Sequence, residues 1–567
     1  MCIGTFLCMM DTTVMNIALP AIQTDLNVPL SQLSWALNIY TITFAVLTIP
    51  LARIADIFGR NKVYVIGLLL LALGSMVAGI ANISIALIIG RAIQSVGAAI
   101  VFPTSMTIGI ESSESSHRDS ALLTIGIVQG LASALGPTIG GVITQFLEWR
   151  WIFFFNLPPL LIALIAVLLQ LPVRHESRIK AKIDFGGMLL SMAALFSLTM
   201  ILTQGSDWGW TSSRIIMLTI VTITAFIGFI FVEKAVKQPM IRLDLFADRQ
   251  FSGTSLAVIL SGLLLITVIV IMPTFYTQIQ GKSELMAALL ITPAEAMVFV
   301  VAPIAGTIIY RVGPRIVIFT GFVSMAISYA ILGFTNPNHY WQTFIGLLFL
   351  GFGYGTVIGP VTVLSASDFK GEKLTASQSV MGVLRQIGNV LAVAIFVSLL
   401  TVNINTAKVS ALKDANDSIN RTALDATTKK TMKSITRARL SGDSIKTSDH
   451  STSSISKKEL NQLIEKRTKV EEQKENVDQF SEPKRTVISK QIKSIITKKI
   501  MTIVYRDNRI IKKTSINIST KAKYLMTEAF LVLYRWTLPA SIVFIAVCLF
   551  FYRRNKFIKF VHGDSNQ

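Results

Sequence analysis

The sequence predicts an all-α integral membrane protein with 14 transmembrane spans and a large polar loop before the last span. Its residues are 52% hydrophobic and 15% charged, with a mean hydropathy of +0.59, which excludes an ordinary soluble domain. Apolar segments of the ~20 residues that a helix needs to cross a bilayer recur along the chain. Basic residues concentrate in alternate connections, as expected when successive connections lie on opposite sides of a membrane.

The connections between most of these apolar segments are short. The segments lie near residues 2–22, 32–52, 63–83, 85–108, 120–143, 152–172, 185–205, 215–235, 251–276, 286–309, 316–334, 342–365, 379–402 and 526–551. With the N-terminus inside, the short cytoplasmic connections and the C-terminal tail hold 20 Lys and Arg, against three in the short outer connections. This asymmetry fits the positive-inside rule, and an even number of spans places both termini in the cytoplasm.

The segment between the last two spans is long and basic. Residues 402–523 contain 27 Lys and Arg against 13 Asp and Glu, a net charge of +14 out of +21 for the chain. Long loops translocate largely regardless of charge, so an extracellular position is compatible with this excess. Composition predicts disorder over residues 403–457. Because no aromatic platform or known motif accompanies the charge, we expect no nucleic acid as a partner.

Isoleucines recur at helical spacing within residues 487–504, with lysines between them. This pattern predicts a basic amphipathic helix. Two interpretations remain open. The helix lies on the outer leaflet and attracts anionic lipid or polymer, or it is solvated or paired with another helix in a small cap.

The sequence contains no motif for ATP hydrolysis or metal binding. Gly281-Lys282-Ser283 is only the tail of a phosphate-binding loop, with Tyr276 where the first glycine would stand. The five His and three Cys form no metal-ligand spacing, so we expect no metal and no cofactor. Any work that the protein does must therefore come from an ion gradient.

The candidate ionisable residues inside the predicted spans are Asp11, Arg91, Glu295, Arg385 and Arg535. Charges are costly in hydrocarbon, so such residues are functional candidates. Asp11 lies half-way along the first span, where desolvation would let it bind and release a proton; the alternative is a structural hydrogen bond to a neighbouring helix. Arg91 cannot deprotonate and could hold a buried carboxylate or polar network. Glu295 is a second candidate acid, and Arg385 is more typical of a structural pin.

Residues 130–141, GLASALGPTIGG, place small residues three and four positions apart on one helix. The candidate residues are Gly130, Gly136, Pro137, Gly140 and Gly141. The glycines leave one face close to bare backbone, which allows close helix packing, and the proline allows a bend. Packing alone would explain the pattern. The functional alternative is a helix that packs tightly and still shifts.

The connection LARIADIFGRNKVY, at residues 51–64, is a tight basic turn. Its candidate residues are Asp56, Gly59, Arg60 and Lys62. The turn is either a plain positive-inside connection or a latch that pairs charges with neighbouring helix ends in one conformation. A partial echo at residues 302–317 keeps a glycine, Gly313, but has Tyr310 where Asp56 would align. A recurring loop suggests two related bundles.

Together these motifs resemble the 14-helix drug:proton antiporter family of the major facilitator superfamily, whose members include quaternary-ammonium and multidrug exporters. DTTVMNIALPAI at 11–22 resembles the first-helix motif, and LARIADIFGRNK resembles the loop motif with Ala52 for its first glycine. RAIQSVGAA resembles the fourth-helix motif with Ser95 for a glycine. GLASALGPTIGG resembles the antiporter motif, followed by WRWIFFFN. The match covers about 1–402 and 525–551; the loop between them departs in size and composition.

The resemblance implies two six-helix bundles that rock about a central cavity. The implied parts are an N-terminal bundle at 1–184, two inserted spans within 185–250, a C-terminal bundle at 251–402 and 525–551, an extracellular loop at 403–524 and a cytoplasmic tail at 552–567. The implied function is export from a bacterium across its plasma membrane, with protons exchanged for hydrophobic, cationic compounds. Asp11 and Arg91 are the proton-coupling candidates.

Asp11, Glu295 and three aromatic residues are the substrate-site candidates. Trp35, Tyr40 and Tyr276 could offer aromatic faces to a cation, although their positions toward span ends favour interfacial anchoring. Two alternatives to export stay open: a proton-coupled importer of a small solute, and a membrane-anchored surface-binding protein that works through the basic loop. The partners expected are protons, small molecules and the lipid bilayer, with a monomer as the expected state.

Overall fold

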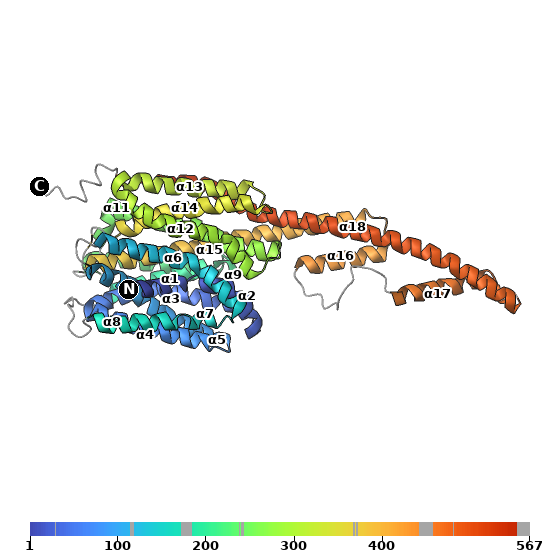
Figure 1. Ribbon diagram of the computed structural model, residues 1–567, viewed down its shortest axis with the longest axis horizontal. Coiled ribbons are helices and arrows are strands. Elements are labelled where there is room, and N and C mark those ends of the chain that lie inside the picture. The colour runs from blue at the N-terminus through green and yellow to red at the C-terminus, as the bar shows by residue number, and fades with distance from the viewer. Residues whose placement is uncertain are drawn as a thin grey trace. The chain divides into compact units, whose positions relative to one another are not determined.

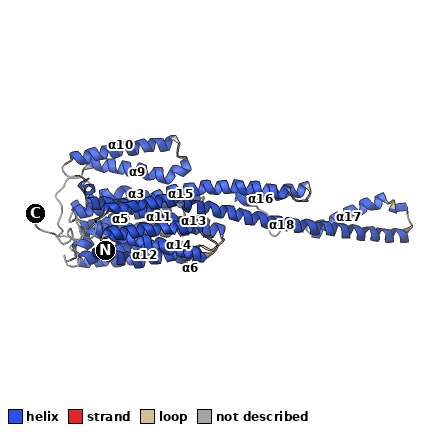
Figure 2. Ribbon diagram, turned by 90° about the horizontal axis from the view of Figure 1, so that it is seen from above, coloured by secondary structure: helices blue, strands red, loops and turns tan. Residues whose placement is uncertain are grey.

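The computed structural model describes residues 1–28, 30–113, 118–171, 184–236, 239, 243–366, 369, 372–441, 457–479 and 481–552. These residues form helices joined by short connections, and the described part contains no strand (Figure 2). The chain divides into two compact units: unit 1, residues Met1–Leu400 and Phe530–Gln567, and unit 2, residues Thr401–Ala529. The all-helical prediction is therefore confirmed.

Unit 1 is built of helices, and the long ones run side by side (Figure 1). They are α1 (Cys2–Met10), α2 (Val14–Leu26), α3 (Leu30–Phe58), α4 (Arg60–Gly79), α5 (Ser84–Glu111), α6 (Arg118–Phe146), α7 (Trp151–Phe154), α8 (Leu157–Gln170), α9 (Phe185–Trp208), α10 (Ser213–Ala235), η1 (Leu243–Ala247), α11 (Arg249–Thr274), the π-helical η2 (Phe275–Ile279), α12 (Glu284–Val312), α13 (Pro314–Phe334), α14 (Tyr340–Leu364) and η4 (Ile545–Phe550). The boundary with unit 2 falls inside α15 (Glu372–Asn420) and α18 (Glu482–Phe544).

Twelve helices in the described residues are long and apolar enough to cross a membrane. They differ in how much protein covers them: 83% of the most apolar window is buried in α14, but only 17% in α10. Side chains of α3, among them Ile42 and Val46, pack with those of α9 and α10 in one apolar cluster. The α9–α10 pair therefore joins unit 1 through one side and leaves the rest of its apolar surface for lipid.

The first predicted span is two helices rather than one. The turn at residues 11–13 separates α1 from α2. Thr12 Oγ1 donates to the Met9 carbonyl at 2.7 Å, and Thr13 Oγ1 donates to the Met10 carbonyl at 3.2 Å. Threonine hydroxyls that bond the preceding turn compete with the helical ladder, which gives a local reason for the break. Apolar periodicity alone does not reveal it.

Unit 2 is helical where composition predicted disorder. Its helices are the end of α15, α16 (Ala426–Ser441), α17 (Lys457–Lys474), η3 (Val477–Gln479) and the first part of α18. The described residues within 403–441 are almost entirely helical, because Ile419, Leu424 and Met432 bury against Ile511 of α18 in a small apolar core. The rest of the predicted disordered segment, residues 442–456, lies outside the described residues, as do residues 553–567 of the predicted tail.

The isoleucine segment 487–504 lies within α18. Its isoleucines line a groove of about 940 Å³ together with side chains of α17 that include Leu463 and Arg467. Ser489 donates to Glu472 of α17. This arrangement corresponds to the paired-helix interpretation. Binding of this segment to anionic lipid remains a prediction.

Candidate functional site

A buried carboxylate lies at the break in the first span. Asp11 is in the turn between α1 and α2, and its exposed fraction is 1%. Its Oδ1 accepts a hydrogen bond from Asn156 Nδ2 at 2.9 Å, and its Oδ2 accepts one from Gln94 Nε2 at 2.7 Å. Amide donors from two other segments therefore hold both oxygens of a carboxylate that the protein shields from solvent.

A serine and an arginine orient these amides. Ser75 Oγ on α4 lies 2.9 Å from Gln94 Nε2 and 3.4 Å from Asn156 Nδ2. Arg91 donates from Nη1 to Gln94 Oε1 at 2.8 Å and from Nη2 to the main-chain oxygen of Asp11 at 3.2 Å. Arg91 thus fixes the turn and the Gln94 amide, while the carboxylate itself is held by amides.

The three aromatic candidates have different surroundings. Tyr40 is fully buried, and its ring centroid lies 4.1 Å from the guanidinium carbon of Arg91. Trp35 is half-buried in the cluster between α3 and α9, and Tyr276 is buried in η2 at the end of α11. The structure thus brings Asp11, Arg91 and Tyr40 together and gives Trp35 and Tyr276 other neighbours. Interfacial anchoring does not describe Tyr40, because a buried cation covers its ring face.

The small-residue helix is α6, which contains Gly130, Gly136, Pro137, Gly140 and Gly141. A β-carbon at Gly136 would lie 1.9 Å from Thr13 Oγ1, and one at Gly140 would lie 2.6 Å from the first carbonyl oxygen of α2. A β-carbon at Gly141 would contact α12 at 3.3 Å. The glycines therefore let α6 approach the broken first span on one side and α12 on another.

A second buried carboxylate faces α6 from α12. Glu295 is 2% exposed, and its Oε2 accepts a hydrogen bond from Thr138 Oγ1 of α6 at 3.2 Å. Thr138 Oγ1 also lies 3.1 Å from Thr292 Oγ1. Glu295 Oε1 has no hydrogen-bond partner among the described residues. Asp11 and Glu295 thus flank the same helix, but Glu295 is the less satisfied of the two.

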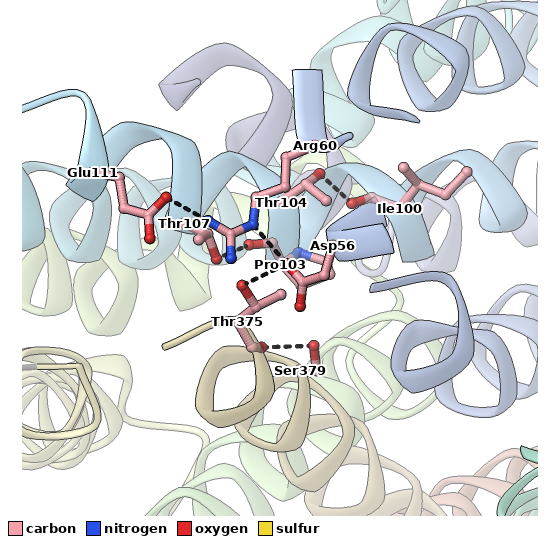
Figure 3. A network of polar contacts seen from close by, with 9 residues as sticks. All are labelled: Asp56, Arg60, Ile100, Pro103, Thr104, Thr107, Glu111, Thr375 and Ser379. Atoms are coloured by element: carbon pink, nitrogen blue, oxygen red, sulfur yellow. Dashed lines mark hydrogen bonds and ion pairs between the residues drawn. The ribbon is translucent and has the colours of Figure 1, made fainter. Parts of the chain in front are cut away.

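Two of the predicted latch residues, Asp56 and Arg60, belong to a polar network at the end of α3 (Figure 3). Asp56 Oδ1 accepts from Arg60 Nε at 2.6 Å and from Thr375 Oγ1 at 3.1 Å, and Arg60 also pairs with Glu111 at the end of α5. Lys62 is half-buried in the next turn. The network therefore ties α3, α4 and α5 to α15, whose Thr375 lies 319 residues further along the chain.

The turn and its echo share one backbone feature. Gly59 has a φ of 114° and Gly313 has a φ of 92°, values that residues with a side chain rarely adopt. Each glycine precedes the first residue of a helix, α4 or α13.

A cavity of about 140 Å³ lies away from the Asp56 end. Its lining residues come from five helices (α3, α5, α9, α11 and α15) and from the broken first span. The polar ones include Thr12, Asn38, Arg91, Thr203, Gln386 and Asn389. Asn38 is 18 residues before Asp56 on α3, a separation of about 27 Å along a helix. The cavity is smaller than a typical drug-binding site, so it suits a few waters in this conformation.

Comparison with known proteins identifies the fold. The family model of the Major Facilitator Superfamily matches residues 1–393. The chain belongs to this superfamily. The solved structure of the proton:xylose symporter XylE bound to 6-bromo-6-deoxy-D-glucose has a TM-score of 0.50 at 16% identity, covering 70% of this chain and 86% of XylE, and supports the fold alone.

Several bacterial relatives in this superfamily are named for drug resistance. The multidrug resistance protein Stp of Mycobacterium tuberculosis is 28% identical, covering 70% of this chain and 74% of Stp. The multidrug transporter protein MdtP of Bacillus subtilis is 29% identical, covering 69% and 72%. The multidrug export protein EmrB of Haemophilus influenzae is 28% identical, covering 68% and 76%. The family resemblance is confirmed, and the chain is a multi-pass plasma-membrane transporter rather than an enzyme.

Sequence reasoning missed the neutral residues of the site. Gln94 and Asn156 stand inside two of the motifs that carried the superfamily resemblance, RAIQSVGAA and WRWIFFFN. Their side chains carry no charge, so the cost of charge in hydrocarbon does not single them out, although an amide is the natural partner of a buried carboxylate. Ser75 and Thr375 lie in ordinary apolar or polar runs, so nothing local could have indicated them.

Proposed function

We propose that this protein is a proton-coupled exporter of hydrophobic, cationic compounds that works by alternating access. The observation that carries the proposal is the Asp11 site, a fully buried carboxylate in a broken transmembrane helix beside the small-residue helix α6. The names of the relatives, which include multidrug resistance and export proteins, support the substrate class. Proton coupling rests on the chemistry of the carboxylate.

Protonation of Asp11 would change its hydrogen bonding rather than only its charge. In the present arrangement, both carboxylate oxygens accept from amide N–H groups. A proton on either oxygen would turn part of that acceptor into an O–H donor that needs an acceptor of its own, so the hydrogen bond from Asn156 or Gln94 would weaken or rearrange. Because Gln94 is also held by Arg91, this change would reach the turn between α1 and α2. Thr13 and Gly136 are in contact at that turn, so α6 would feel it.

The arrangement of contacts supports alternating access. At one end, α15 is joined to α3 through Thr375 and Asp56, and further along the same helix Gln386 and Asn389 line the cavity. One end is thus closed while space remains toward the other, as expected of one state in a two-state cycle. We assign the closed Asp56 end to the cytoplasm, because its connections carry the excess of basic residues.

The proposed topology has fourteen crossings. Twelve crossings are the span-like helices, and the other two are the α1–α2 pair and α6. The 29 residues of α6 extend about 44 Å, which exceeds the thickness of the bilayer core. Both termini then lie in the cytoplasm, and residues 403–524 lie outside. The N-terminal bundle is residues 1–184, and the C-terminal bundle is residues 251–402 together with 525–551. Residues 185–250 carry the two inserted spans between these bundles. A monomer is the proposed state.

Glu295 is the proposed counter-charge for a cationic substrate. It lies at the contact of α6 with α12, with one oxygen free of hydrogen bonds among the described residues. A buried carboxylate with a free oxygen can be stabilised by a cation as well as by a proton. Trp35 and Tyr276 are proposed to contribute apolar and aromatic surface when the bundles separate.

The test is transport in reconstituted vesicles with an imposed proton gradient. The wild-type protein is expected to move ethidium against its gradient, and a protonophore should abolish the movement. Asp11→Asn keeps a side chain of the same size but cannot cycle a proton, so it should lose coupled transport by at least about 100-fold. Asp25→Asn is the matched control, because Asp25 is a half-exposed carboxylate paired with Arg150.

Three outcomes would contradict the proposal. Full gradient-driven export by Asp11→Asn would remove Asp11 from the coupling step. Accumulation of solute in the direction of the proton flow would favour the importer. Absence of any transport by folded protein, together with binding activity in the loop, would favour the surface-binding alternative.

A further inference from the structure

Residues 375–385 of α15 pack tightly against α3, α5 and α6 of unit 1. Thr375 bonds Asp56 of α3, and a β-carbon at Gly382 would lie 2.8 Å from the ring of Phe102 on α5. Arg385 donates to Gln129 of α6 at 2.8 Å. Positions seven and ten residues apart share one side of a helix. These three contacts therefore form one continuous closed surface, which we call the α15 gate.

Arg385 stands at the border between this closed surface and the cavity. The next residue, Gln386, lines the cavity, as do Asn389 and Val390 one turn later. The packed and the hollow parts of α15 thus meet at Arg385. Any motion that opens the gate toward the Asp56 end must break the contact between Arg385 and Gln129.

Arg385 is poorly satisfied for a buried arginine. It is 9% exposed, and its acceptors are Gln129 Oε1 and, at 3.5 Å, the thioether sulfur of Met9. Its Nε has no hydrogen-bond partner among the described residues. By contrast, Arg91 reaches three oxygen acceptors, and Arg60 pairs with two carboxylates.

This environment makes the closed gate costly. A guanidinium cannot lose its proton, so Arg385 remains charged in a dry interface. A neutral amide and a thioether compensate such a charge poorly, and a buried cation without a carboxylate partner destabilises the state that contains it. Opening of the gate would hydrate the guanidinium and remove this cost.

We propose that Arg385 is a positioning residue whose under-compensated charge keeps the α15 gate reversible. The inference rests on the alternating-access part of the proposed function and deepens it. Arg385 destabilises the closed gate relative to the open one, so that the gate releases when the coupling site changes state. A well-satisfied side chain at this position would hold the gate shut and slow the cycle.

The experiment measures gate opening directly. A reporter cysteine replaces Ser379, which is 2% exposed on α15 between Thr375 and Gly382, in a background where the three native cysteines are replaced. Its reaction rate with a membrane-permeant maleimide, measured on folded protein in vesicles without substrate or gradient, reports how often the gate opens.

Three variants of the interface have predicted signs. Arg385→Met keeps the length and removes the charge, so labelling should slow at least fivefold. Gln129→Glu supplies a carboxylate partner, and labelling should slow similarly. Arg385→Lys keeps the charge and should stay within about twofold of the unchanged protein. In transport assays, Arg385→Met should lower kcat with little change in KM, because substrate contacts are retained.

Arg535→Met serves as the matched control. Arg535 also lies within the membrane-spanning part of α18, but its Nε donates to the Gly333 carbonyl at 2.6 Å, away from the gate. Its replacement should leave the labelling of position 379 unchanged.

Faster or unchanged labelling in Arg385→Met would overturn the proposal. Faster labelling would mean that Arg385 holds the gate closed, and unchanged labelling would mean that its charge does not affect opening. If Arg385→Met does not fold, Gln129→Glu and Arg385→Lys give the same test. The labelling rates are measured without a drug. If the variants show the predicted rates but the protein exports no drug, the result contradicts the export function and leaves the role of Arg385 in the gate intact.

Discussion

The two halves of unit 1 repeat a backbone turn but not its chemistry. Gly59 and Gly313 precede α4 and α13 with similar positive φ values, 114° and 92°. Three residues before them stand Asp56 in the first half and Tyr310 in the second. Only the first turn therefore brings a carboxylate to the network that reaches α15. The two turns thus share a backbone geometry, while the pair of Asp56 with Arg60 belongs to the first turn.

The buried carboxylates Asp11 and Glu295 also differ between the two halves, in how many of their oxygens accept hydrogen bonds. Asp11, in the first half, has both oxygens bonded to amides. Glu295, in the second half, has one oxygen bonded to Thr138 and the other without a partner among the described residues. A saturated carboxylate suits a site that exchanges only a proton, whereas an unsaturated one has capacity for a further ligand. The difference suggests a division of labour between the halves.

Replacements of Glu295 and Asp11, compared side by side, test this division and carry the largest expected effects. Glu295→Gln should reduce export of cationic dyes about tenfold, because the substrate loses its counter-charge, while neutral lipophilic substrates keep near-normal rates. Asp11→Asn should instead abolish coupled export of both classes. Parallel efflux assays with one cationic and one neutral dye measure the pattern. Equal losses for both dyes in Glu295→Gln would assign Glu295 to coupling instead.

A smaller effect is expected from the two turns. Asp56→Asn keeps an acceptor for Thr375 but loses the ion pair with Arg60, so the transport rate should fall about threefold to tenfold. Tyr310→Phe, at the corresponding position of the echo, should change the rate less than twofold. Initial efflux rates, normalised to folded protein, measure both. Similar losses in the two variants would show that the halves share the latch function after all.

More of the fold than of the candidate site could be predicted from the sequence. Apolar length and charge asymmetry suffice for the membrane class, because the bilayer imposes the same requirement on every span. The break at residues 11–13 was hidden, since threonine hydroxyls interrupt a helix without lowering its mean hydropathy much. The cross-chain contacts of Asp56 with Thr375 and of Arg385 with Gln129 could not be predicted, because they depend on helix packing between residues more than 250 positions apart.

Within unit 2, the disorder expected for residues 403–441 was wrong for a related physical reason. The unit's Ser, Thr and Lys content is typical of disorder, and each of its short helices would be marginal alone. The long helix α18 supplies an apolar side, including Ile511, against which Ile419 and Met432 bury. Composition counts such residues but does not place them on one face.

The smallest expected effect on transport comes from removing unit 2, the extra segment of the second half. Asn403 Nδ2 lies 3.4 Å from the Ala529 carbonyl oxygen, so a short Gly-Ser linker can replace residues 404–528 without stretching the chain. Asp11, Glu295 and the latch residues Asp56, Arg60 and Thr375 all lie in unit 1. Export of a cationic dye should therefore stay within about twofold of the full chain, and Asp11→Asn should still abolish it in the shortened protein. Loss of export by a shortened protein that reaches the membrane and remains monodisperse would make unit 2 part of the transport path. The asymmetry between the halves would then extend beyond the buried carboxylates to the segment inserted in the second half.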